Sequence, residues 1–179
     1  MWVWMMLWLL GVPDVEARKV PGVVPSADVS DHEAHALEAA LDAYEEARAM
    51  LARDEFLPLD EPARRVIARL DEARDGLGPH HLLRKPIAAA MTAADKLTMA
   101  RRIELAREHF SELSRSLVTI ARKEPRLREG RGLFYCPMVK GYPYWIQIGE
   151  TVENPYMGAS MRTCGRRVGW DEPEITTPS

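Results

Sequence analysis

The sequence predicts an all-α fold, a four-helix up-and-down bundle followed by an irregular segment that contains cysteine and methionine. Between residues 30 and 125, apolar side chains recur every three or four positions in four stretches, which is the spacing of one helix face. Short breaks containing proline or glycine separate these stretches. Beyond residue 126 the helical period is lost, and the runs LFY and YWIQI have the composition of short strands.

The first predicted helix begins at Ser30, because Ser30 and Glu33 have the spacing of a capping box. Its apolar stripe continues to Leu51, and the sequence DEFLPLDEP then breaks the pattern. The second predicted helix begins near Asp60, with Pro62 in its first turn, where proline is tolerated. The sequence DGLGP ends this helix.

The third predicted helix has Pro86 in its first turn and a face of small side chains that lets a neighbouring helix approach closely. The fourth is expected from Thr98 to about Arg122, with Pro125 as its stop. No helix can bury its apolar stripe alone, so we expect the four to pack as an antiparallel bundle over residues 30–125.

The composition suits one soluble domain and excludes some functions. The chain has 179 residues, of which 28% are charged, and a net charge of −3. Nucleic acid is not an expected partner, because phosphate binding needs a surplus of basic side chains. The sequence contains no phosphate-binding loop, dinucleotide fingerprint, paired carboxylates or nucleophile with an activating base. We therefore do not expect an enzyme.

The first ten residues, MWVWMMLWLL, are all apolar. They are too few to span a bilayer, which needs about 20, but they suit the apolar region of a signal peptide. Val15 and Ala17 offer small side chains at the cleavage positions. We predict a signal peptide over 1–17, a linker over 18–29, and a periplasmic or secreted protein with no membrane span after cleavage. A buried N-terminal segment and a lipid-embedded anchor are the alternatives.

Both cysteines lie in the irregular segment, each within three residues of a methionine. Two short loops can bring these sulfur atoms together, and such soft donors favour Cu(I) or Ag(I) over hard cations. Zn(II) more often recruits histidine or four cysteines, and none of the five histidines is close in sequence. The candidate metal ligands are Cys136, Met138, Met161 and Cys164, with Met157 as an additional donor.

A disulfide between Cys136 and Cys164 is the alternative, since paired thiols tend to oxidise outside the cytoplasm. The methionines would then pack around a structural bridge, and the chain would be a non-enzymatic interaction module of an envelope complex. Redox-controlled exchange between bridged and metal-bound states is a third interpretation. Trp145 either covers this site or fills the join between the segment and the bundle. The spacing alone leaves these alternatives open.

Four sequence features together resemble a known family. They are AREHFSELS at 106–114, CPM at 136–138, Trp145, and NPYMGASMRTCG at 154–165. In this order and spacing, residues 32–165 resemble a small helical domain that occurs alone as a secreted protein, or fused to periplasmic adaptor subunits of copper/silver RND efflux systems. The likeness is specific in the tail and loose in the first two helices. The family usually has an aromatic residue where this chain has Met157.

This resemblance implies heavy-metal binding in the cell envelope, most of all of Cu(I), as a chaperone or a sink beside an efflux pump. Carried over by motif, the ligands are Cys136, Met138, Met161 and Cys164. The implied partners are the metal ion and an efflux adaptor or another copper-handling protein. We expect residues 126–165 to be a metal-binding segment packed on the bundle, and residues 166–179 to be a flexible tail.

Overall fold

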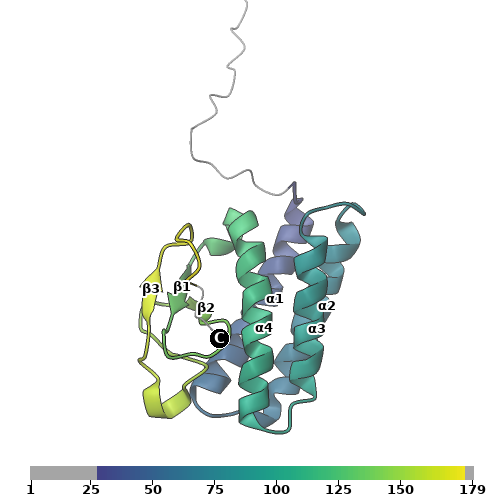
Figure 1. Cartoon of the computed structure of the whole chain (residues 1–179). Coiled ribbons are helices and arrows are strands. Elements are labelled where there is room, and N and C mark those ends of the chain that lie inside the picture. Colours follow the sequence, from purple (N-terminus) through teal and green to yellow (C-terminus); the bar gives the residue numbers. More distant parts are fainter. Residues whose placement is uncertain (1–27, 176–179) are drawn as a thin grey trace, which may run out of the picture.

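The computed structural model describes residues 28–175, which form four helices and a small sheet beside them (Figure 1). The expected signal peptide, residues 1–17, and most of the expected linker lie outside the described residues. Within residues 28–175, no helix is both long enough and apolar enough to cross a membrane.

Four helices occupy the region in which periodicity predicts them: α1 Asp31–Ala52, α2 Asp60–Gly76, α3 Arg84–Thr98 and α4 Ile103–Lys123. The capping box at the start of α1 is confirmed, with the Ser30 backbone N–H donating to the Glu33 carboxylate at 2.8 Å. The predicted start of the fourth helix at Thr98 is wrong. Thr98 instead ends α3, and Arg102 is extended (φ −142°, ψ 147°) because the chain must reverse between two antiparallel helices.

The four helices form two layers, with α1 and α2 behind α4 and α3, and the bundle is more open between α1 and α4 than between the other neighbours (Figure 1). Each helix packs mainly on its neighbours in sequence, while α1 and α4 contact each other much less. The strand β2, Tyr144–Ile148, packs against α4 and also contacts α1. The C-terminal segment therefore covers apolar surface that a closed bundle would bury between its first and last helices.

The sheet has three antiparallel strands in the order β2-β1-β3, where β1 is Arg131–Tyr135 and β3 is Arg166–Val168. The prediction of an all-α fold is therefore wrong, and the protein is a mixed α/β protein. β1 is buried along almost its whole length, so its sequence shows no alternation of apolar and polar residues. β3 has only three residues, RRV, which carry almost no strand signal. The structure places this strand in the sheet, where the sequence suggested the start of a flexible tail.

A row of aromatic rings joins the helices to the sheet. Tyr44 of α1 stacks on Phe110 of α4 with 4.7 Å between ring centroids, and Phe110 lies 6.0 Å from Tyr156. Tyr156 meets Trp145 of β2 edge-on at 5.9 Å, and Trp145 stacks on Phe134 of β1 at 5.7 Å. Each such pair stabilises the fold by about 0.5–1.5 kcal/mol beyond its buried area. The bundle and the C-terminal segment thus share one core.

Candidate metal-binding site

The two cysteines lie at the same end of the β1–β3 strand pair. Cys136 directly follows β1, and Cys164 precedes β3 by two residues. The two strands are antiparallel with Tyr135 opposite Arg166, so the register brings the cysteines close together. Cys136 is fully buried, Cys164 is half-buried, and the two are not bridged. The structure therefore brings the two cysteine-containing loops together.

The Cys136 thiol affects the titration of the neighbouring Cys164 thiol. Hydrogen bonding with Cys136, together with burial, raises the pKa of the Cys164 thiol to about 11. A second thiolate beside the first would add unfavourable repulsion in this half-buried place. The Cys164 thiol therefore carries its proton at neutral pH, and a soft cation that binds it must displace that proton.

The methionines lie on the same two loops as the cysteines, but none of them is fully buried. Met138 is 61% exposed on the β1–β2 loop, and Met161 is 41% exposed at the end of the short helix η3, Gly158–Met161. Met157 is half-buried immediately before η3. Within residues 28–175, no group of three or more His, Cys, Asp or Glu side chains is placed to hold a metal ion. A metal site here would have to rest on sulfur.

The first loop is a short turn stabilised by its own backbone. The Cys136 N–H donates to the Pro143 carbonyl at 3.1 Å, which extends the β1–β2 ladder by one bond. The Val139 N–H donates to the Cys136 carbonyl at 3.3 Å, and this turn places Pro137 and Met138 at its tip. The Cys136 thiol therefore points into the protein while the next donor, Met138, lies at the surface.

The second loop is held closed by one buried side chain, Asn154. Its Oδ1 accepts the backbone N–H groups of Tyr156 at 2.8 Å and Met157 at 3.2 Å, and its Nδ2 donates to the Cys164 carbonyl at 2.7 Å. Its own N–H donates to the Arg162 carbonyl at 2.7 Å. Irregular backbone lacks a ladder to satisfy its polar groups, so a side chain takes that role. Asn154 thereby fixes the position of Cys164.

Arginines then attach this loop to the helices. The guanidinium of Arg107, on α4, donates to the Pro155 carbonyl at 3.0 Å and to the Leu51 carbonyl at the end of α1 at 3.1 Å. Arg162, on the loop, donates to the Ala52 carbonyl at 3.2 Å. These bonds also satisfy two of the last carbonyls of α1, which have no partner within their own helix. One set of contacts therefore caps α1 and anchors the sulfur loop.

Further polar contacts join the end of α1 to the same loop. Arg48, which is 2% exposed, donates to the Glu153 carbonyl at 2.6 Å. The Asp54 carboxylate pairs with Arg107 and accepts the Ala159 N–H at 3.1 Å. Gly158 has a positive φ of +59°, and a Cβ there would overlap the Asp54 and Arg107 side chains. Glycine is therefore required at this position by both the backbone angle and the close approach.

Sequence reasoning identified the sulfur residues but assigned no role to the residues that hold them. Arg107, Phe110 and Ser114 are three and four residues apart, so they share one face of α4. Arg107 binds the loop, Phe110 stacks on Tyr44, and the Ser114 hydroxyl lies 2.8 Å from the Tyr44 hydroxyl. The spacing of arginine, phenylalanine and serine in AREHFSELS is the sequence signal that could have identified this face of α4 as the one that contacts the C-terminal segment.

Trp145 fills the join between the segment and the bundle, and it also borders the sulfur loop. Its ring is fully buried, and its Nε1 donates to the Gln147 side chain at 3.1 Å. A Cβ added to Gly165, next to Cys164, would lie 2.8 Å from this ring. The interpretation that Trp145 fills the join is confirmed, and the interpretation that it covers a metal site stays a prediction.

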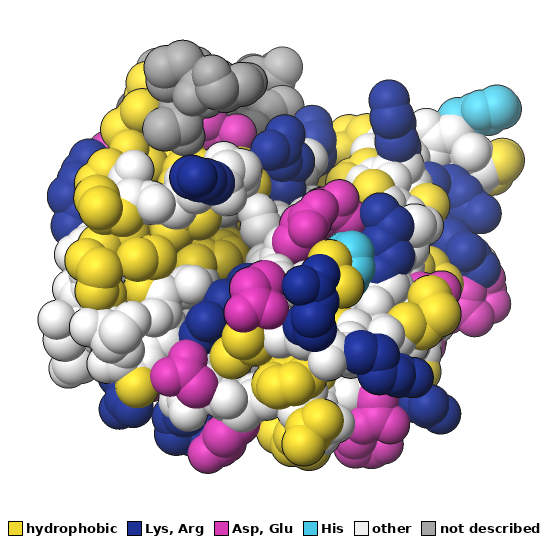
Figure 2. All heavy atoms as spheres, turned by 60° about the horizontal axis from the view of Figure 1, so that its bottom comes forward, with side chains coloured by type: hydrophobic (Ala, Val, Ile, Leu, Met, Phe, Trp, Pro, Cys, Tyr) yellow, Lys and Arg dark blue, Asp and Glu magenta, His cyan; other side chains and the backbone are white. Residues whose placement is uncertain are grey.

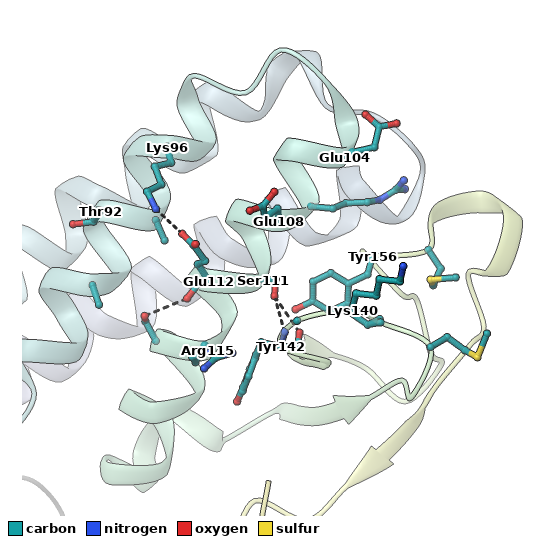
Figure 3. A pocket seen from close by; sticks show the side chains of 18 residues that line it. Thr92, Lys96, Glu104, Glu108, Ser111, Glu112, Arg115, Lys140, Tyr142 and Tyr156 are labelled. Carbon is teal, nitrogen blue, oxygen red and sulfur yellow. Dashed lines mark hydrogen bonds and ion pairs between the residues drawn. The ribbon is translucent and has the colours of Figure 1, made fainter. Parts of the chain in front are cut away.

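The methionine side of the site opens onto a cleft of about 1080 Å³ between α3, α4 and the β1–β2 loop (Figure 3). Met138 and Met157 both line this cleft. Figure 2 brings forward the end of the molecule near η3, where hydrophobic side chains gather on the side of the C-terminal segment and charged ones of both signs alternate over the helices. Met138 and Met157 are therefore reachable from solvent through this cleft.

Comparisons of this chain with protein-family profiles, curated proteins and solved structures give no match.

Proposed function

We propose that this protein binds Cu(I), or Ag(I), through Cys136 and Cys164 with thioether donors from Met138 and Met161. The observation that carries the proposal is that the strand register brings two unbridged thiols together where β1 ends and β3 begins, with exposed methionines on the same loops. Thiolate and thioether donors select Cu(I) over harder divalent cations. Met157, half-buried on the second loop, is an additional donor.

The chemistry of the site is ligand exchange. Cu(I) replaces the protons of Cys136 and Cys164, while the neutral thioethers bind without losing a proton. The thiols are fixed by Asn154 and the strand register, whereas Met138 and Met161 are exposed. Exposed thioethers can bind the ion first and release it last, so the ion can pass to a partner through an intermediate that shares ligands.

In biological terms, we propose a chaperone or sink for Cu(I) in the cell envelope, periplasmic or secreted, that works beside a heavy-metal efflux system. The apolar first ten residues and the resemblance to domains of copper/silver efflux adaptors support this location and role. Its partners would be the metal ion and an efflux adaptor or another copper-handling protein.

An anaerobic Cu(I) titration tests the proposal. The reduced protein competes with a chromogenic Cu(I) chelator, beside a Cys136→Ser/Cys164→Ser double variant. We expect the native protein to remove about one equivalent of Cu(I) and the double variant to remove none. Circular dichroism of the variant checks that the fold is intact. Equal competition by both proteins would place the metal elsewhere.

A thiol count on the protein purified in air separates this proposal from the interaction-module alternative. A structural disulfide between Cys136 and Cys164 would leave no reactive thiol, and the oxidised protein would not respond to Cu(I). If the reduced protein also fails to compete with the chelator, copper binding is wrong and the domain is better treated as a structural module of an envelope or efflux complex.

A further inference from the structure

The cleft beside the methionines has two kinds of wall. One is the outer face of α3 and α4, and the other is the loop from Met138 to Tyr142 together with Tyr156 and Met157 (Figure 3). The loop is pinned to α4 because the Ser111 hydroxyl donates to the Tyr142 carbonyl at 3.2 Å and accepts the Tyr142 N–H at 3.1 Å. The cleft is therefore preformed, and its volume of about 1080 Å³ suits a small organic ligand.

Charges in the cleft are only partly neutralised. Lys96 pairs with Glu112 at 2.9 Å, and Arg107 pairs with Asp54. Across residues 28–175, the structure gives no ion-pair partner to four other charged lining residues: Glu104, Glu108, Arg115 and Lys140. Arg115 lies over the Tyr142 ring, 5.0 Å from its centroid. Two carboxylates and two cationic side chains are thus available to bind a ligand that carries both positive and negative groups.

These charges are arranged along one line. Glu104, Glu108 and Arg115 are four and seven residues apart, so they share one face of α4, and Lys140 lies on the loop wall of the cleft beside Tyr156 (Figure 3). Glu108 and Arg115 are separated by about 10 Å along the helix axis at about 1.5 Å per residue. An extended chain of three residues spans about 10 Å between its ends. The charge spacing therefore matches the ammonium and carboxylate ends of a short peptide.

Sulfur is the third feature of this cleft. Met138 and Met157 line it, and Cys136 precedes Met138 by two residues in the chain. We propose that the cleft binds a short zwitterionic peptide, about three residues long, that carries a thiol and delivers Cu(I) to Met138 and Cys136. The delivery step rests on the proposed copper-binding function, whereas the peptide binding does not.

The delivery step balances without a change in oxidation state. The carrier peptide holds Cu(I) as a thiolate complex, and the exposed Met138 thioether, which lines the cleft, bonds to Cu(I) first. Cys136 is buried and does not line the cleft, so the bond from Cu(I) to its sulfur forms in a second step, as the bond to the carrier sulfur breaks. The proton lost by the Cys136 thiol passes to the carrier thiolate, so the carrier leaves as a free thiol. The ammonium end of the carrier contacts Glu104 or Glu108, and its carboxylates contact Arg115 and Lys140.

The test uses glutathione, a tripeptide with two carboxylates, one ammonium group and one thiol, and its S-methyl derivative, which cannot bind Cu(I) as a thiolate. Both are titrated into the reduced, metal-free full chain and followed by amide chemical shifts and calorimetry. We expect both to bind, with shifts at α4 and the 138–142 loop. Lys140→Glu should weaken binding about tenfold. The control is Lys85→Glu, another exposed lysine without an ion pair, on α3 outside the cleft, which should bind normally.

Cu(I)–glutathione is then offered to the same three proteins, and the rate of metal uptake is measured. Slower uptake by Lys140→Glu, with unchanged final Cu(I) affinity against the chelator, supports delivery through the cleft. Absence of shifts in the cleft, or equal binding by Lys140→Glu and the native chain, overturns this inference and leaves the copper proposal intact. Peptide binding without Cu(I) uptake from the carrier overturns the delivery step. If the reduced protein also fails to take Cu(I) from the chelator, the proposed function is overturned as well, while the peptide site stands.

Discussion

The helical region and the C-terminal segment are stabilised in different ways. The helices bury regular apolar stripes, and their backbone groups bond within each helix. The segment from residue 149 to 165 has little regular structure and is held by specific polar bonds from Asn154, Arg107, Arg162 and Arg48. Many small apolar contacts stabilise the helices, whereas hydrogen bonds from a few side chains stabilise the segment. Damage to the first should lower overall stability, and damage to the second should act on the site.

The largest expected effect is on the helical side of this comparison. Leu70→Ala removes a fully buried side chain from α2 and leaves a cavity, which should lower the free energy of unfolding by about 3–4 kcal/mol. Urea denaturation measures this loss. The protein that stays folded should keep its native Cu(I) affinity, because Leu70 lies outside the sulfur loops. A parallel loss of affinity would mean that the two regions are more tightly coupled than their contacts suggest.

A smaller loss of stability with a larger effect on the site is expected for Asn154→Ala. Three backbone groups lose their partner, including the Cys164 carbonyl, and each unsatisfied buried group costs about 1–3 kcal/mol unless water reaches it. We expect a total cost of about 2–3 kcal/mol and a Cu(I) affinity at least about tenfold weaker. Denaturation and chelator competition on the same samples measure both. Native Cu(I) affinity would show that the loop does not need Asn154.

The pH dependence of Cu(I) binding distinguishes the segment chemically from the helices. The pKa of the Cys164 thiol is raised to about 11, so this group is protonated in the metal-free protein throughout the neutral range. Cu(I) must displace that proton, and apparent affinity should therefore rise about tenfold per pH unit for this thiol between pH 6 and 9. In the metal-free protein, the same raised pKa makes stability fall as pH increases from about 9 through 11. A Cu(I) affinity independent of pH would exclude Cys164 as a thiol ligand.

The smallest effect expected is that of a single thioether. Met138→Leu keeps the apolar bulk and removes one soft donor, so Cu(I) affinity should fall by a factor of about ten with almost no change in stability. Met99→Leu is the matched control, because Met99 is 57% exposed and Met138 is 61% exposed, but Met99 lies between α3 and α4. Equal affinities for the two variants would limit the site to the cysteines.

The sequence determined the helices well because each is a local pattern. The stripe from Ala34 to Leu51 and the Ser30–Glu33 capping box depend only on neighbours within a few residues, and both are present in the structure. Thr98 was misassigned because the third and fourth stripes run close together in the chain, and only the reversal at Arg102 separates them.

Tertiary structure decided the sheet and the scaffold of the site. β3 has three residues whose strand character comes from pairing with β1, and that pairing is what brings Cys164 to Cys136. Arg107 reads in the sequence as one more charged helical residue, yet it bonds a carbonyl 48 positions away. The sequence by itself fixed which atoms are available as soft donors and where helices form, because both are properties of residues and their near neighbours. Which polar groups meet across the chain depends on the packed arrangement, because a hydrogen bond to a distant carbonyl leaves no periodic trace in the sequence.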